Sequence, residues 1–483
     1  MVLHSFCNED SRHVMSNPGD QDITPIESVT QLASLLAQGS KPQDAWRIGT
    51  EHEKFGFIRP QATPAGRSPW LPPPYEPDGI HAVLSALQQG EGRAWHDIRD
   101  KGALIGLKGA EAHKGASISL EPAGQFELSG KPLATLHETR TEMDGHFNSL
   151  HPICERLGIG FAPLGFHPFA RRGDMPTMPK SRYAIMRDYM PKVGTLGLDM
   201  MLRTCTVQVN LDFASEQDMA RKLRVSLALQ PVATALFANS PFYEGHPNGL
   251  LSNRAHVWTD TDNRRSGMPV EFFAPHFGFE AYVEWLLDVP MYFIMRDGRI
   301  HDVAGRSFRA WMNGESQKGL EGLTPTMGDF EDHMTTAFTD VRLKQFLEMR
   351  GADAGSPEMM LAQSALWVGL LYDDAALAAA DALVHEQPWE SYVTLRAEVP
   401  RLGLHAPWAG GSVRDLAKRM VDIATDGLHA RAQKDATGRD EAHYLDPLHE
   451  ITSGGPTQAE AWLQAYHGRW GRDVTRIFDE AAI

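Results

Sequence analysis

The sequence predicts an α+β fold, with one mostly antiparallel sheet, helices around it and a helical C-terminal part. The first observation is the alternation in Thr206-Val-Gln-Val-Asn-Leu-Asp212, where apolar and polar side chains take opposite faces of a strand. The second is that Glu51-His-Glu53, Gln125-Phe-Glu127 and Glu348-Met-Arg350 repeat this design with charged residues. Their outer residues share a face, roughly 6.6 Å apart along a strand. We therefore expect one sheet whose polar faces form a single metal- and phosphate-binding cavity.

Composition sets the size and the surroundings of this fold. A chain of 483 residues exceeds what one core usually organises, so two lobes or one elaborated domain are expected. The net charge of −16 argues against a nucleic-acid surface and against attraction to anionic lipid. No stretch approaches the ~20 apolar residues of a membrane span.

Cysteine usage and the N-terminal residues bear on the compartment. Cys7, Cys154 and Cys205 are too few for a disulfide framework and form no C-x-x-C motif, which favours a reducing compartment. The first residues contain no apolar run typical of a signal peptide. We therefore predict a cytoplasmic protein.

The first elements follow from capping and proline signals. Residues 1–23 are expected to form a flexible tail. Thr24-Pro25-Ile26-Glu27 matches a capping box and predicts a helix to about Gln38. A strand is expected from about Trp46 to Ile58. The proline-rich stretch 59–79 predicts a loop or lid, because proline disrupts both helices and central strands.

The middle of the chain alternates helices with strands. Residues 102–129 combine glycine with short strand-like pieces, and a helix from Pro132 to Leu157 is closed by Gly158. Residues 160–200 look irregular and hold the densest cationic stretch of the chain. Further elements are expected as a helix at 78–88, a helix at 215–237 kinked at Pro231, an irregular segment at 239–278, a helix at 279–287, a strand at 291–295, a helix at 330–338 and a strand at 342–350.

The character of the chain changes near residue 356. Apolar, alanine-rich helical patterns are expected at 356–384 and 412–431, and a third helix begins at Thr457. We expect these helices to pack on the outside of the sheet. The chain is thus divided into a tail (1–23), a catalytic sheet-containing region (24–355) and a helical region packed on the same domain (356–483).

Familiar nucleotide, zinc and serine-hydrolase motifs are absent, so the chemistry must come from the carboxylates on the strands. Glutamates that share one cavity repel each other, and burial would raise their pKa values. A hard divalent cation removes this conflict, and Mg²⁺ is favoured because it binds carboxylates together with substrate phosphates. Arg350, on the face of Glu348, would suit a phosphate oxygen.

Plain structural roles remain open for each residue. An isolated Glu-x-Glu is more often the solvated face of an edge strand, although Phe55 and Phe57 continue the face of Glu51 and argue against full exposure. Gln208 and Asn210 could be hydrogen-bonded core amides. Single arginines are more often solvated charges. The interpretation from spacing depends on several strands having the same design.

Six strings of the sequence are specific enough to compare with known families. They are Ile48-Gly-Thr-Glu-His-Glu-Lys-Phe-Gly56, Ile118-Ser-Leu-Glu-Pro-Ala-Gly-Gln-Phe-Glu-Leu-Ser-Gly130, Arg203-Thr-Cys-Thr-Val-Gln-Val-Asn-Leu-Asp-Phe213, Ala238-Asn-Ser-Pro241, Asp288-Val-Pro-Met-Tyr-Phe293 and Leu347-Glu-Met-Arg-Gly-Ala-Asp353. These strings resemble glutamate–cysteine ligases of the plant and proteobacterial type, and the resemblance extends over about residues 25–480.

The resemblance implies a glutamine-synthetase-like curved sheet and the first step of glutathione synthesis. ATP, as co-substrate, would phosphorylate the γ-carboxylate of glutamate, and the amine of cysteine would then attack the acyl phosphate. The implied partners are the small molecules glutamate, cysteine and ATP, with Mg²⁺ as cofactor and no nucleic acid or membrane. The protein would be a monomer or a homodimer.

The resemblance also implies roles for individual residues. Metal ligands would be Glu51, Glu53, Glu127 and Glu348, with Glu121 and Gln208 as further members of the set. Glu53 and Arg350 would act in catalysis, with Arg350 holding phosphate. The substrate carboxylates would be bound by Arg182, Arg254 and Arg187, with Asn210 in the same pocket.

Two departures and several alternatives accompany this interpretation. Relatives usually have a second glycine where Ala123 stands, a small change, and the cysteines do not match the regulatory pairs of plant members, so no thiol switch is expected. A ligase for another amine is the nearest alternative. A metal-dependent hydrolase would turn over without ATP, and a non-catalytic ion- or nucleotide-binding protein would turn over nothing.

Overall fold

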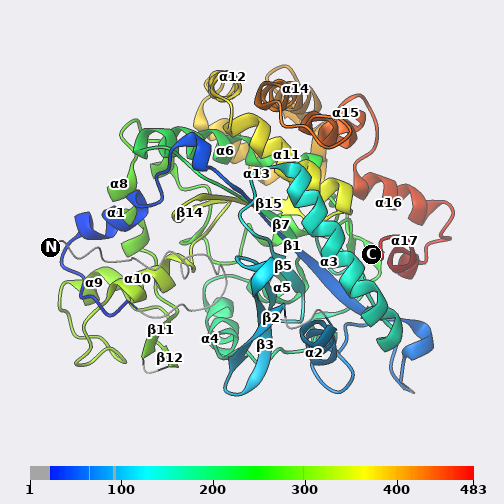
Figure 1. The fold of residues 1–483 in the computed structure, drawn as a ribbon, viewed down its shortest axis with the longest axis horizontal. Helices are drawn as coiled ribbons and strands as arrows, with labels where there is room; N and C mark the ends of the chain where they lie inside the picture. The colour runs from blue at the N-terminus through cyan, green and yellow to red at the C-terminus, as the bar shows by residue number, and fades with distance from the viewer. Residues whose placement is uncertain (1–21, 65, 91–93, 297) are drawn as a thin grey trace.

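The main sheet lies at the centre of the molecule (Figure 1). The computed structural model describes residues 22–64, 66–90, 94–296 and 298–483. Within these residues the sheet has nine strands in the order β14-β15-β7-β1-β5-β4-β3-β2, with β6 also paired to β1. Every pairing in it is antiparallel, so the predicted α+β class is confirmed. The strands are β1 (Ile48–Ile58), β2 (Trp95–Asp100), β3 (Ala103–Gly109), β4 (Ser117–Leu120), β5 (Phe126–Ser129), β6 (Ile159–Ala162), β7 (Thr206–Leu211), β14 (Val341–Leu343) and β15 (Leu347–Asp353).

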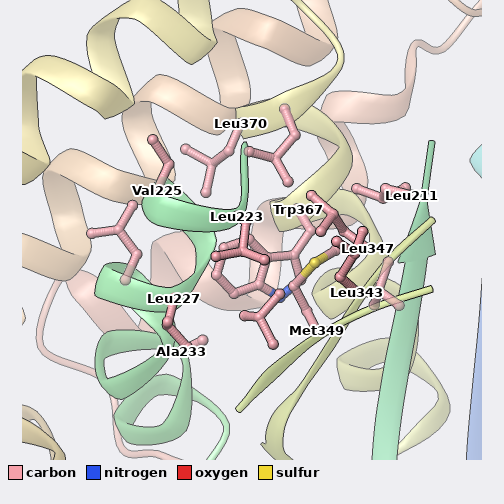
Figure 2. Packing of buried hydrophobic residues seen from close by; sticks show 14 of the residues in the cluster. Leu211, Leu223, Val225, Leu227, Ala233, Leu343, Leu347, Met349, Trp367 and Leu370 are labelled. Atoms are coloured by element: carbon pink, nitrogen blue, oxygen red, sulfur yellow. The ribbon is translucent and has the colours of Figure 1, made fainter. Parts of the chain in front are cut away.

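Long helices cover one face of this sheet. They include α3 (Leu136–Leu157), α6 (Glu216–Leu236) and α11 (Pro357–Leu371). Figure 2 shows Leu211, Leu347 and Met349 packed with side chains of α6 and α11 such as Leu223 and Trp367. Because side chains alternate along a strand, this packing leaves the polar residues of β7 and β15 on the opposite face.

The remaining helices surround the sheet, and those of the C-terminal part lie along one side of the molecule (Figure 1, yellow to red). All the remaining α-helices of the described residues are α1 (Val29–Ala37), α2 (Ile80–Gly90), α4 (Ser181–Tyr189), α5 (Gly197–Arg203), α7 (Asn253–Val257), α8 (Phe279–Leu287), α9 (Phe308–Met312), α10 (Met327–Met334), α12 (Asp374–Val384), α13 (Trp389–Leu402), α14 (Val413–Arg431), α15 (Asp446–Thr452), α16 (Gln458–His467) and α17 (Ile477–Glu480). No helix in the described ranges is both long and apolar enough to cross a membrane.

Short strand pairs complete the fold. They are β8 (Phe242–Tyr243) with β9 (His246–Pro247), β10 (Ser266–Gly267) with β13 (Phe338–Thr339), β11 (Phe293–Arg296) with β12 (Arg299–Asp302), and β16 (Pro407–Trp408) with β17 (Gly411–Ser412). Of the predicted tail, residues 1–21 lie outside the described residues, as does Cys7. Cys154 and Cys205 are buried and free.

Several predicted boundaries are wrong. Thr24 does not begin the first helix: Ser28 caps α1 through the backbone N–H of Gln31, and Pro25 instead forms a bridge with Thr326. The segment 160–200 is not irregular throughout, because it contains α4 and the start of α5. The helix predicted at 356–384 is two helices, α11 and α12, and α13 was not predicted.

The most consequential correction concerns residues 342–350. They do not form one strand but the hairpin of β14 and β15, in which Arg342 lies directly opposite Glu348. The single-strand prediction failed because Lys344-Gln-Phe346 carries no glycine or proline to mark the turn. The hairpin brings a cation to a carboxylate at the edge of the polar face.

Candidate active site

Strand register brings the predicted glutamates together. Glu53 on β1 is paired with Glu127 on β5, and Glu51 is paired with Gln208 on β7. Directly opposed side chains in an antiparallel pair have Cβ atoms about 4.5–5.5 Å apart. The Ser129 hydroxyl reaches both Glu127 (2.6 Å) and Glu51 (3.4 Å). The convergence expected from the strand pattern is therefore present.

These side chains line one cavity of about 180 Å³ on the polar face of the sheet, which we call the carboxylate cavity. The predicted residues along it are Glu51, Glu53, Glu121, Glu127, Gln208, Glu348, Arg350 and Arg182. Residues along it that sequence reasoning did not select include Tyr183, Phe293, Thr336, Phe338 and Arg342. Phe55 and Phe57 continue the face of Glu51 and are buried, as expected.

Of the other predicted residues, Asn210 and Arg254 lie near this cavity and Arg187 does not. Asn210 donates to Glu51 at 2.8 Å. Arg254 lines an adjoining pocket together with Arg350, which borders both spaces. Arg187 is exposed on α4 and does not line the cavity, so the structure does not bring it to the site. The cationic composition of residues 180–192 could not distinguish Arg187 from Arg182, because composition alone does not say which face of a helix each side chain takes.

The pKa values of Glu51 and Glu53 are raised in this cavity. The pKa of Glu51 is raised to about 8, mainly by burial and also by the charges of Glu127 and Glu348. Burial also raises the pKa of Glu53 well above its ordinary value, as do the carboxylates of Glu121 and Glu127. Arg254 and the backbone N–H of Thr206, which donates to Glu53 at 2.9 Å, act in the opposite direction.

Glu348 borders the same cavity, but cations rather than carboxylates surround it. Arg342 binds it through Nε (2.6 Å) and Nη2 (3.0 Å), and Arg350 donates to it at 2.8 Å. Burial alone would raise the pKa of Glu348, but Arg342, Lys344 and Arg350 together hold it below the ordinary value. Arg342 and Lys344 were missed at the sequence level. Their alternation just before Glu348 would have indicated them had the hairpin been recognised.

The donor set decides whether a metal ion fits. In the described part of the chain, no three His, Cys, Asp or Glu side chains are already arranged as a metal site. Instead, Glu51 and Glu127 accept hydrogen bonds from Asn210 and serine hydroxyls. Glu51 and Glu53, which are buried carboxylates with raised pKa values, nevertheless fit a hard divalent cation, which needs oxygen ligands and brings positive charge. Glu348 fits less well alone, because nearby cations already compensate its charge.

Comparison with known proteins gives a consistent assignment. The family model described as Glutamate-cysteine ligase family 2 matches residues 47–480. The chain is similar to the chloroplastic glutamate–cysteine ligase of Nicotiana tabacum, with 47% identity over 96% of this chain and 85% of that protein. Its identity to the chloroplastic enzyme of Arabidopsis thaliana is 46%, over 99% of this chain and 89% of that protein.

A solved structure is also similar in outline. It is glutamate–cysteine ligase from Francisella tularensis in complex with AMP, with a TM-score of 0.48 and 11% identity, covering 90% of this chain and 87% of that chain. The family assignment depends on the family model and the plant relatives.

The relatives correct the predicted location. They are named chloroplastic, and this finding contradicts the cytoplasmic prediction. That prediction was drawn from cysteine usage and the lack of a signal peptide. Cysteine usage reports only the redox state of a compartment, so it could not distinguish one reducing compartment from another.

Proposed function

The chain belongs to glutamate–cysteine ligase family 2, and from that premise we propose how its carboxylate cavity performs the reaction. The protein is a ligase that joins the γ-carboxylate of glutamate to the amine of cysteine, the first step of glutathione synthesis. A γ-carboxylate oxygen attacks the γ-phosphorus of ATP and ADP leaves. The neutral cysteine amine then attacks the acyl carbon of γ-glutamyl phosphate, and phosphate leaves as the amide forms and the nitrogen loses one proton.

Both displacements need positioning and charge neutralisation more than covalent help from the protein. Mg²⁺, when bound, supplies positive charge to the phosphate oxygens and to the γ-carboxylate. Glu51, Glu53 and Glu127 would hold it, with Glu121, Gln208 and Glu348 at the edge of the set. The observation that carries this proposal is the burial of carboxylates with raised pKa values on one face of the sheet.

Cationic side chains complete the proposed site. Arg350 borders both the carboxylate cavity and the adjoining pocket, and we assign it to phosphate. Arg182 lies beside Tyr183, which donates to Glu121 at 3.3 Å, at one side of the cavity. Arg254 lines the adjoining pocket. We assign these two arginines to the carboxylates of glutamate, and Asn210 to the placement of Glu51. At about 180 Å³ the cavity suits the reacting groups rather than a whole nucleotide, since ligand pockets typically measure about 300–1,000 Å³.

ADP release is the test of the function. We expect release only when glutamate, cysteine, ATP and Mg²⁺ are all present. Replacing cysteine with other amines tests the nearest alternative, and a faster rate with another amine would reassign the second substrate. Turnover of a substrate without ATP would instead indicate a hydrolase, and no turnover of any mixture would contradict the ligase assignment.

Removal of Mg²⁺ should act on stability as well as on activity. A ligand that binds only the folded state stabilises it, by about 2.7 kcal/mol at a hundred times its Kd. Saturating Mg²⁺ should therefore raise the thermal unfolding midpoint of the protein, and EDTA should reverse the rise and stop ADP release. The same midpoint with and without Mg²⁺ would contradict a metal site at these carboxylates.

A further inference from the structure

Asp353 is a buried carboxylate that the reaction scheme leaves without a role. It lies at the end of β15, opposite Thr206, and is 2% exposed. A register shift between Met349 and Ala352 marks a β-bulge. A bulge adds a residue to one strand and so changes which side chains share a face. Asp353 thereby takes the side of the sheet that carries Glu348 and Arg350.

Each oxygen of this carboxylate accepts a hydrogen bond from a hydroxyl group, and one of them also accepts from a backbone N–H. Oδ2 accepts from the Ser240 hydroxyl (2.6 Å) and from the backbone N–H of Asn239 (2.8 Å). Oδ1 accepts from the Ser252 hydroxyl at 2.8 Å. Gly165 lies against the carboxyl group, since a Cβ there would be 2.2 Å from its carbon. Asp353 is thus fixed in one position between separate segments.

The two serines connect Asp353 to α7, the helix that contains Arg254. Ser252 is the N-cap of α7 and accepts from the backbone N–H of Ala255 at 3.0 Å. The Ser240 hydroxyl accepts from the backbone N–H of Arg254 at 3.2 Å. Asp353 therefore holds, through one hydroxyl each, the start of α7 and the backbone of the arginine that α7 carries.

Arg254 in turn lines the pocket that adjoins the carboxylate cavity, together with Arg350. Its Nη2 donates to the backbone carbonyl of Arg350 at 2.8 Å, and its side chain is buried. Its Nε has no hydrogen-bond partner among the described residues. Burial lowers the pKa of Arg254, and Asp353 followed by Glu53 opposes that shift. Asp353 thus influences Arg254 by its charge as well as through the serines.

We propose that Asp353 is a positioning residue that sets Arg254 for a carboxylate of the substrate glutamate, acting through Ser240 and Ser252. This rests on the proposed function, in which Arg254 binds that carboxylate. It gives a role to two sequence strings that otherwise have none, Ala238-Asn-Ser-Pro241 and the end of Leu347-Glu-Met-Arg-Gly-Ala-Asp353. The strings meet because the bulge in β15 turns Asp353 toward the serines.

The test is Asp353→Asn, read as a split between KM and kcat. An asparagine offers one acceptor oxygen where the carboxylate offers two, so a serine hydroxyl or the Asn239 N–H loses its partner. We expect KM for glutamate to rise at least about tenfold, as expected for one lost buried hydrogen bond, with kcat and KM for ATP changed less than about threefold. An unchanged KM for glutamate would overturn the proposal.

A matched control separates positioning from general loss of stability. Glu441→Gln weakens another buried pair, in which Arg431 donates to Glu441 at 3.2 Å and the backbone N–H of Leu136 donates to it at 2.6 Å, away from the residues that line the cavity. It should lower the thermal midpoint and leave KM for glutamate unchanged. An increase in KM equal to that of Asp353→Asn would overturn the proposal.

If Asp353→Asn does not fold, Ser252→Ala gives the same readout, because it removes one partner and keeps the carboxylate. A rise in KM for glutamate supports the proposal, and an unchanged KM overturns it. Failure of the proposed function is distinguishable, since the unaltered protein would then release no ADP with both amino acids present.

Discussion

Glu53→Gln should lower kcat for ADP release by more than about 100-fold and leave the protein folded. Loss of a residue that only supports a metal ligand typically costs 10–100-fold, and Glu53 is assigned to the metal itself. The amide oxygen of glutamine can still accept from the Thr206 N–H, which donates to Glu53 at 2.9 Å. Because Glu121 and Glu127 repel the Glu53 carboxylate, the change should not lower the free energy of unfolding measured without metal.

A matched control for this variant lies on the other side of the sheet. Burial also raises the pKa of Glu142, on α3, but this residue lines a separate cavity with Ile118 and Leu128. Glu142→Gln should change kcat less than about twofold, since surface and remote substitutions have small effects. The account of the carboxylate cavity is contradicted if Glu53→Gln keeps a tenth or more of the activity, or if Glu142→Gln loses as much.

Glu348→Gln should have the largest effect on stability. It leaves the buried cations Arg342 and Lys344, and the partly buried Arg350, without the carboxylate that compensates them. Removing one partner of a buried ion pair typically costs 3–5 kcal/mol, because the remaining charge stays buried and unpaired. We expect a loss of about this size in the free energy of unfolding at pH 7, measured with urea.

The pH dependence of this loss gives an internal check. The folded-state pKa of Glu348 lies below the ordinary value of about 4.3, so its stabilisation is present above that pH. It is lost as the pH falls through the folded-state pKa, and the difference between the two proteins should therefore shrink at low pH. Glu284→Gln is the control: the exposed Glu284–Arg309 pair at 2.6 Å should be worth less than about 1 kcal/mol. Equal losses for the two variants would be inconsistent with a buried charge network at Glu348.

The sequence predicted which residues take the polar face of the sheet better than which of them lie opposite one another. Alternation alone placed Gln208 and Asn210 on the polar face of β7, and the paired glutamates on that of β1, because a strand has a fixed period of two. It could not say that Glu53 lies opposite Glu127, since register is set by the whole sheet. The family resemblance implied that both glutamates are metal ligands, and the register that opposes them comes from the structure.

The residues that sequence reasoning missed depend on local breaks in regular structure. Arg342 faces Glu348 only because an unmarked turn divides residues 342–350. Asp353 reaches Ser240 and Ser252 only because β15 contains a bulge, and strict alternation would have given it the opposite face from Glu348. Arg187 does not reach the cavity because it lies on a regular helix that was not predicted from the sequence. Charge density indicated a cationic segment, and the helix α4 then turned Arg187 to solvent.

The transfer of oxygen between substrates tests the reaction at the carboxylate cavity most directly. Glutamate labelled with ¹⁸O in its γ-carboxylate should pass one labelled oxygen to the released phosphate, because that oxygen bridges carbon and phosphorus in γ-glutamyl phosphate. The phosphate can be analysed by mass spectrometry in the presence of ATP, Mg²⁺ and cysteine. Singly labelled phosphate is the predicted result, and unlabelled phosphate formed alongside the amide product would contradict it.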